Sequence, residues 1–139
     1  MNRTELQRLS AERIADAHAL LAASQWSGAY YLAGYALECA LKSCVLAHID
    51  KTGIIFEDKK FGERCWTHEV EELVRLAGIA VERDVAAGAN VNLRRHWDVA
   101  QDWSEASRYR LIAQADAEEL YHALTDATDG ILPWVKNYW

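Results

Sequence analysis

Apolar residues run almost without interruption from Trp26 to Ala47, where the chain reads WSGAYYLAGYALECALKSCVLA. Only two charged residues, Glu38 and Lys42, fall inside this stretch. A helix that is apolar on nearly every face lies in the middle of a soluble bundle or in a membrane. A membrane span of about 20 residues tolerates few charges, so this pair favours the central helix of a soluble domain. We predict that the helix is capped by Ser27 and ends near Ile49.

Polar groups on this helix are confined to one row. Tyr31, Tyr35, Glu38 and Lys42 follow one another at spacings of four, three and four residues, which places them on the same helical face. Gly34 lies beside this row, and a glycine costs roughly 1 kcal/mol relative to alanine in a helix interior. We therefore expect a neighbouring helix to approach the backbone closely at Gly34.

The pattern before this stretch also has helical spacing. Leu6, Leu9 and Ile14 recur on one side of the segment 1–24, with charged residues on the other. Thr4 and Gln7 have the spacing of a capping box, so we expect the helix to begin there. A short turn then joins it to the apolar helix, and the two predict a hairpin.

Helical patterns continue to the end of the chain, and no strand pattern or internal repeat is found. The sequence therefore predicts an all-α, up-and-down bundle in a single domain, 1–139, with two long hairpin helices, short connecting helices and a long C-terminal helix. The remaining elements are predicted to be a loop over 50–66, a helix over 68–77 capped by Thr67, a short helix over 79–87 stopped by Gly88, a helix from Asn90 or Asn92 to Ala100, an irregular stretch or short turn over 104–110, and a final helix over 112–137 kinked by Pro133.

Composition is that of one globular domain, since 51% of the 139 residues are hydrophobic and 26% are charged. The formal net charge is −6, from 21 acidic and 15 basic residues. Non-specific nucleic-acid binders are usually basic, so a broad nucleic-acid surface is not expected. A local basic site stays open, because four arginines fall within seventeen residues: Arg94, Arg95, Arg108 and Arg110.

Three cysteines argue against a disulfide framework, because their number is odd and Cys39 and Cys44 lie inside the apolar helix. Free buried cysteines suit a reducing compartment, and residues 1–10 lack the apolar core of a signal peptide. We therefore expect a cytoplasmic protein that is not in the membrane. Cys65 and His68 have a C-x-x-H spacing, but two further ligands at compatible spacing are missing, so no metal site is expected. No motif for a cofactor is found.

Three stretches carry a resemblance. The run from Ala29 to Lys42, AYYLAGYALECALK, resembles the second helix of HEPN-domain proteins, which has an A-x-E-x-A-L-K core. The segment 67–73, THEVEEL, is similar to the family's H-D-L-x-x-L helix start, with Glu69-Val70 in place of the commoner Asp-Leu. The segment 103–109, WSEASRY, resembles the W-S-x-x-x-R-Y segment of one prokaryotic branch. The three stretches occur in the family's order over most of the chain.

The resemblance implies a helical bundle that is commonly dimeric. Many prokaryotic members act with a minimal nucleotidyltransferase as a toxin–antitoxin pair, and many are metal-independent endoribonucleases with an Arg-x(4–6)-His motif. This chain departs from that motif. The histidine that follows Arg108 and Arg110 is His122, which is too far, and Arg64 precedes His68 by too few residues. Ribonuclease activity of the usual kind is therefore not implied.

The candidate ligand-binding residues are polar groups of the apolar helix and of the WSEASRY segment: Glu38, Lys42, Tyr31, Tyr35, Arg108 and Tyr109. Lysine and arginine recognise phosphate groups, and a carboxylate orients them. Glu38 and Lys42 can equally form an ion pair that only fixes helix packing. Arg108 and Tyr109 can equally form a packing corner. Arg108 and His68 are the catalytic candidates, since histidine serves as a general acid or base, although His68 can equally be a packing residue.

Two functions follow from these residues. The first is a HEPN-like binding and assembly module that forms a homodimer and works with a nucleotidyltransferase-type protein, with a nucleotide or RNA at a local site. The alternative is a divergent metal-independent endoribonuclease or nucleotide-binding enzyme that uses Arg108, His68, Glu38 and Lys42. A third possibility is a structural subunit of a larger complex.

Three aromatic residues lie near the end of the chain: Trp134, Tyr138 and Trp139. They form either a partner surface or a tail that packs on the bundle.

Overall fold

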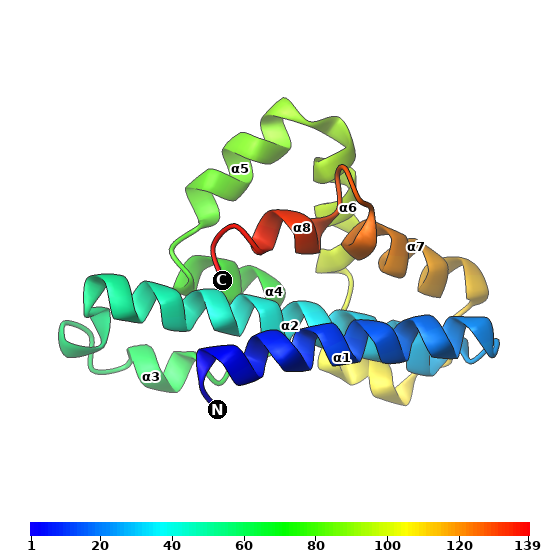
Figure 1. Cartoon of the computed structure of the whole chain (residues 1–139), viewed down its shortest axis with the longest axis horizontal. Helices are drawn as coiled ribbons and strands as arrows, with labels where there is room; N and C mark the ends of the chain where they lie inside the picture. The colour runs from blue at the N-terminus through cyan, green and yellow to red at the C-terminus, as the bar shows by residue number, and fades with distance from the viewer.

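All elements of the fold are helical in the computed structural model, which describes all 139 residues. The two longest helices, α1 (Arg3–Ala22) and α2 (Trp26–Thr52), form an antiparallel hairpin along the base of the molecule (Figure 1). Helix α2 also contacts α4 (Val70–Leu76), α7 (Gln114–Thr125) and α8 (Ile131–Val135). The predicted all-α class and the predicted hairpin are confirmed.

The apolar helix is the centre of the core. Thirteen residues of α2 are buried, including Ala33, Leu37 and Leu41. By length and composition alone α2 could cross a membrane, but 61% of its apolar window is buried inside the bundle. Its hydrophobic surface is therefore covered by the other helices of the chain, which is how the core helix of a bundle is used.

Both ends of α2 differ from the prediction. The helix continues for one turn beyond Ile49 to Thr52 and ends where Gly53 adopts a left-handed conformation with φ of 67°. Glycine takes this conformation without steric cost, so it ends the helix. At the other end Ser27 is not the N-cap. Its hydroxyl instead accepts a hydrogen bond at 2.9 Å from the backbone N–H of Ile112.

The cap of α1 also differs from the prediction. Asn2, not Thr4, is the N-cap: its side chain accepts a hydrogen bond from the Glu5 N–H, and the Glu5 carboxylate accepts one from the Asn2 N–H. This reciprocal pair is a complete capping box, and it begins the helix at Arg3.

Short elements connect the hairpin to the C-terminal helices. Helix α4 starts at Val70, so His68 lies in the turn before it and not inside the predicted helix 68–77. Asn90 caps α6, as one of the two predicted alternatives. Gly88 lies inside α5 and does not stop it. The bounds are η1 Ile54–Phe56 and α3 Phe61–Arg64 within the predicted loop, α5 Ala80–Ala89, α6 Val91–Gln101 and η2 Glu105–Tyr109, where η marks a 3₁₀ helix.

The predicted long helix over 112–137 is wrong, because two helices, α7 and α8, occupy this stretch (Figure 1). The carboxylate of Asp126 accepts hydrogen bonds from the backbone N–H groups of Thr128 and Asp129, which turns the chain after α7. Those bonds hold the pKa of Asp126 below its usual range. Pro133 lies within five-residue α8, close to its start, where a missing N–H costs little.

The C-terminal aromatic residues pack on the bundle. The rings of Trp134 and Trp97 meet edge to face with centroids 5.9 Å apart, and Tyr138 packs against Trp134 at 4.9 Å. The backbone carbonyl of Trp139 accepts a hydrogen bond from the Arg3 guanidinium. Of the two alternatives for this segment, the structure shows the packed tail.

Candidate functional site

The segment that follows α6 is held against α2 by a close contact between Gly34 and the side chain of Trp103. A Cβ atom built on Gly34 would lie 2.1 Å from Cε2 of the Trp103 indole. The buried indole also packs on the ring of Tyr31, with centroids 6.3 Å apart. Gly34 is thus a close-contact point as predicted, but its neighbour is an aromatic side chain and not a helix backbone. This contact holds the segment 103–109 against α2.

Glu38 is the buried anchor of the site. Its side chain is 3% exposed, and its Oε1 accepts a hydrogen bond at 2.8 Å from Nζ of Lys42. The same oxygen lies 2.9 Å from Nδ1 of His68, which comes from the turn before α4. The second oxygen, Oε2, is buried without a partner. Glu38 therefore fixes both Lys42 and the orientation of the His68 ring.

The other nitrogen of His68 faces a second carboxylate. Its Nε2 lies 3.2 Å from Oε2 of Glu105, the first residue of η2. Neutral imidazole has one N–H, whereas imidazolium has two. An imidazolium ring therefore satisfies both carboxylates at once, and in that form His68 joins α2, the turn before α4 and η2.

His68 lies in the lining of an open cleft with a volume of about 700 Å³. This volume is within the range of about 300–1,000 Å³ that is typical of ligand sites. The cleft lies between the turn before α4, the end of α6 and η2. Its lining comprises Thr67, His68, Glu69, Val70, Glu71, Gln101, Trp103, Ser104, Glu105 and Ala106.

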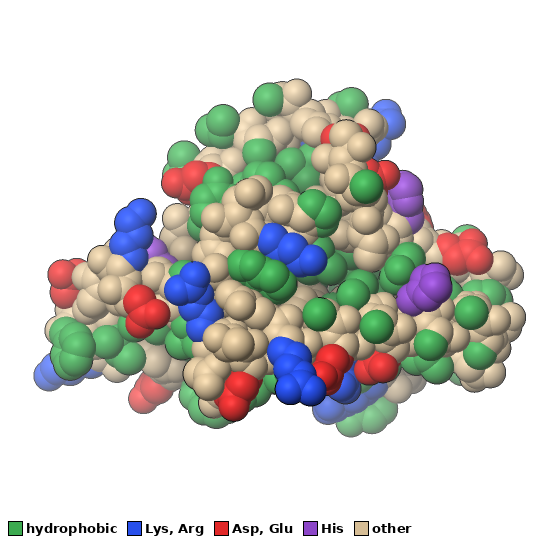
Figure 2. All heavy atoms as spheres, in the orientation of Figure 1, with side chains coloured by type: hydrophobic (Ala, Val, Ile, Leu, Met, Phe, Trp, Pro, Cys, Tyr) green, Lys and Arg blue, Asp and Glu red, His purple; other side chains and the backbone are tan.

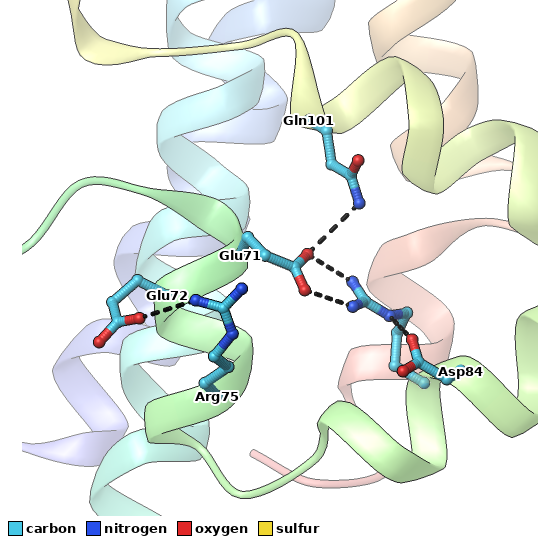
Figure 3. A network of polar contacts seen from close by, with 6 residues as sticks. Glu71, Glu72, Arg75, Asp84 and Gln101 are labelled. Carbon is cyan, nitrogen blue, oxygen red and sulfur yellow. Dashed lines mark hydrogen bonds and ion pairs between the residues drawn. The ribbon is translucent and has the colours of Figure 1, made fainter.

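One wall of the cleft is held by a network between three helices (Figure 3). Both carboxylate oxygens of Glu71 accept hydrogen bonds from the Arg83 guanidinium, at 2.6 and 2.9 Å, and Gln101 donates a further bond to Glu71. The Arg83 hydrogen bond holds the pKa of Glu71 below its usual range. Arg83 also donates to Asp84 and lies over the Trp97 ring. The charge of Glu71 is therefore largely compensated.

The remaining predicted residues, Tyr31, Tyr35, Arg108 and Tyr109, do not line the His68 cleft. Tyr31 and Tyr35 pack on each other along α2, with ring centroids 6.2 Å apart, and burial raises the pKa of Tyr35. Arg108 is exposed on η2, and its guanidinium lies 4.9 Å from the ring centroid of Tyr109. Contact with Tyr109 and then Tyr31 raises the pKa of Arg108. Tyr109 is 80% exposed as a residue, so it does not fill the core.

Of the predicted row on α2, Glu38 contacts His68 and Lys42 is joined to it through Glu38, whereas no ion pair joins Arg108 to Glu38. Sequence reasoning missed Glu105, although it lies in the WSEASRY segment. It occupies a variable position of the resembling motif and has no partner nearby in sequence. Only the packing of η2 against α2 brings it to His68.

The two buried cysteines are not activated as nucleophiles, and the possible metal ligands are not grouped. Burial raises the pKa of Cys39 to about 11 and that of Cys44 to about 12, so neither is a ready nucleophile. No group of three or more His, Cys, Asp and Glu side chains is placed to hold a metal ion.

The arginines do not form a broad basic surface on the face shown in Figure 2, where Lys and Arg side chains are separated by apolar and acidic ones.

Fold and site together define an all-α bundle with a histidine held between two carboxylates beside an open cleft. No protein-family model, curated protein or solved structure matches the chain.

Proposed function

We propose that the chain is a HEPN-like binding and assembly module of the cytoplasm that self-associates, works with a nucleotidyltransferase-type protein and binds a phosphate-bearing ligand of nucleotide type at the His68 cleft. One observation carries the binding site: His68, which is held by the buried carboxylate of the Glu38–Lys42 pair, lines an open cleft of about 700 Å³. Arg108, on the same short helix as Glu105, supplies an exposed guanidinium.

Two carboxylates at the site are compensated by basic side chains, which favours an anionic ligand. Lys42 compensates Glu38, and Arg83 compensates Glu71, so these two carboxylates repel an anion only weakly. His68 and Arg108 are the donors of the site, since Arg108 is exposed and Nε2 of the 43% exposed His68 side chain faces only the Glu105 carboxylate. Charge-assisted hydrogen bonds from such groups to phosphate are among the stronger polar contacts in proteins.

Exposed apolar side chains support the assembly part of the proposal. Trp66 is exposed at the edge of a shallow groove whose volume is about 240 Å³, below that of most ligand sites. Exposed aromatic residues beside small apolar grooves are common in protein interfaces. The groove is lined by Met1, Leu6, Lys42, Val45, Leu46, Ile49, Gly62, Cys65 and Trp66.

We expect AMP to bind the purified protein and binding to weaken at least about tenfold in His68→Ala and in Arg108→Ala, because each loses a hydrogen-bond donor to phosphate. Isothermal titration calorimetry at low salt measures both affinities. Arg94→Ala is the control, because Arg94 is exposed and lies seven residues before the lining residue Gln101 on α6, whereas Arg108 closely follows the lining residues Glu105 and Ala106 on η2. Equal affinity in all four proteins would place the ligand elsewhere.

Sedimentation of the same samples tests whether the protein forms a dimer. A monomer mass would contradict the proposed self-association.

A second candidate function is favoured by the orientation of His68. Its Nδ1 is held by a buried carboxylate while Nε2 contacts Glu105 in the lining of the cleft, and a histidine oriented in this way can act as a general acid or base. A divergent ribonuclease would use this histidine with Arg108. Cleavage of RNA by the pure protein, lost in both His68→Ala and Arg108→Ala, would favour this enzyme over the binding module.

A further inference from the structure

We propose that Glu105 is a built-in competitor for the ligand of the His68 cleft: its carboxylate takes the place that a phosphate group takes when the ligand binds. This inference rests on the proposed function and adds to it an internal group that lowers ligand affinity. The juxtaposition that carries it is the contact between Nε2 of His68 and Oε2 of Glu105 at 3.2 Å.

Only one nitrogen of His68 is open to a ligand. Nδ1 is engaged by the buried carboxylate of Glu38, whose side chain is 3% exposed. Nε2 is directed at Glu105, and both residues line the same cleft. A carboxylate and a phosphate oxygen accept the same kind of hydrogen bond from an imidazolium N–H. A phosphate can therefore reach Nε2 only when the Glu105 carboxylate leaves it.

Moving the Glu105 carboxylate away from His68 costs little free energy in this structure. Its side chain is 44% exposed, and His68 is its one ion-pair partner. Glu105 is also the first residue of a five-residue 3₁₀ helix, so its side chain can turn into solvent without unfolding α6 or α7. Exposed ion pairs contribute little, so this competition lowers ligand affinity by a modest factor.

Arg108 can supply a second donor to a phosphate that replaces the Glu105 carboxylate. Residues three apart in a 3₁₀ helix lie above one another, so Glu105 and Arg108 lie on the same side of η2. Tyr109 is the main cause of the raised pKa of Arg108, and the Glu105 carboxylate also raises it. A phosphate in the place of the Glu105 carboxylate would therefore face Nε2 of His68 and lie on the side of η2 that carries Arg108.

The test compares two variants that remove the same charge from the same cleft. Glu105→Gln removes the carboxylate that faces His68, whereas Glu69→Gln removes an exposed carboxylate of the lining that has no ion pair with His68. We expect AMP to bind Glu105→Gln about threefold to tenfold more tightly than the unmodified protein, and Glu69→Gln to change affinity by less than about twofold. Glu105→Ala, which removes the acceptor altogether, should show the same gain as Glu105→Gln.

Calorimetry with AMP, adenosine and inorganic phosphate identifies the group that competes. A gain in Glu105→Gln for AMP and phosphate, but not for adenosine, supports the proposal. Weaker binding in Glu105→Gln, or an equal gain in Glu69→Gln, overturns it while leaving the proposed function in place. Absence of AMP binding to every variant overturns both. Loss of the Glu105→Gln gain when His68→Ala is added confirms that competition occurs at His68.

Discussion

Gly34→Ala is expected to lower the free energy of unfolding by about 2–3 kcal/mol, which is large for the addition of one methyl group. The new Cβ would lie 2.1 Å from Cε2 and 2.2 Å from Nε1 of the Trp103 indole. Trp103 is buried and cannot turn into solvent without leaving its place against Tyr31. Urea unfolding followed by circular dichroism measures the change.

The matched control for this substitution is Gly88→Ala. Gly88 lies inside α5, and no atom is found within 4 Å of a Cβ built there. The exchange should therefore stabilise the protein by up to about 1 kcal/mol through helix propensity alone. Gly34→Ala should also weaken AMP binding, because Trp103 lines the His68 cleft. Equal stability changes in the two variants would show that Trp103 does not pack closely on Gly34.

The central helix can be predicted because its evidence is local. Its apolar residues cover nearly all faces, and only Glu38 and Lys42 interrupt them, so periodicity alone places it in the core. Gly34 is predictable as a contact point for the same reason, since a glycine in a helix interior needs an explanation. The identity of its neighbour is not predictable, because Trp103 lies 69 positions away in the sequence.

The C-terminal region shows where periodicity fails. Alanines and leucines continue at helical spacing from α7 towards α8, so the pattern predicts one helix. The break depends on Asp126, whose side chain accepts backbone hydrogen bonds from the two turn residues Thr128 and Asp129. Aspartate competes with helical hydrogen bonding in this way, but it does so at only some positions. Apolar spacing does not report this competition.

The residues of the candidate site also differ in whether local sequence spacing predicts them. Tyr31, Tyr35, Glu38 and Lys42 share one face of one helix, so their spacing in the sequence is enough to group them. His68 joins them through the packing of the turn before α4, and the family resemblance also points to this histidine. Glu105 has no signal of either kind. A residue whose role depends on one long-range contact is visible only in the folded chain.

Arg83→Ala is expected to destabilise the protein by about 2–3 kcal/mol, because it removes a buried cation with several partners. The Arg83 side chain is 8% exposed, donates to both oxygens of Glu71 and to Asp84, and lies over the Trp97 ring. The effect stays below that of a fully buried pair, since Glu71 is 35% exposed and water screens its charge. Thermal unfolding measures it.

The control for Arg83→Ala is a substitution of Arg75, which contacts Glu72 at 3.2 Å on the exposed side of α4 (Figure 3). Arg75→Ala removes the same side chain from an exposed ion pair, so the expected change is less than about 0.5 kcal/mol. A similar loss of stability in both variants would show that the Glu71 network contributes no more than a surface ion pair.

The dependence on pH separates the ion pair from the packing of Arg83. Arg83 lowers the pKa of Glu71 in the folded protein, so the stabilisation is fully present above the pKa of an unfolded glutamate and is lost as pH falls through the folded pKa. The difference in stability between the unmodified protein and Arg83→Ala should therefore shrink as the solution is acidified through that range. The part that persists in acid is the packing of the Arg83 stem and guanidinium on Trp97. A difference that stays constant with pH would show that packing alone explains the effect of Arg83, and that Glu71 is an ordinary carboxylate in the wall of the cleft.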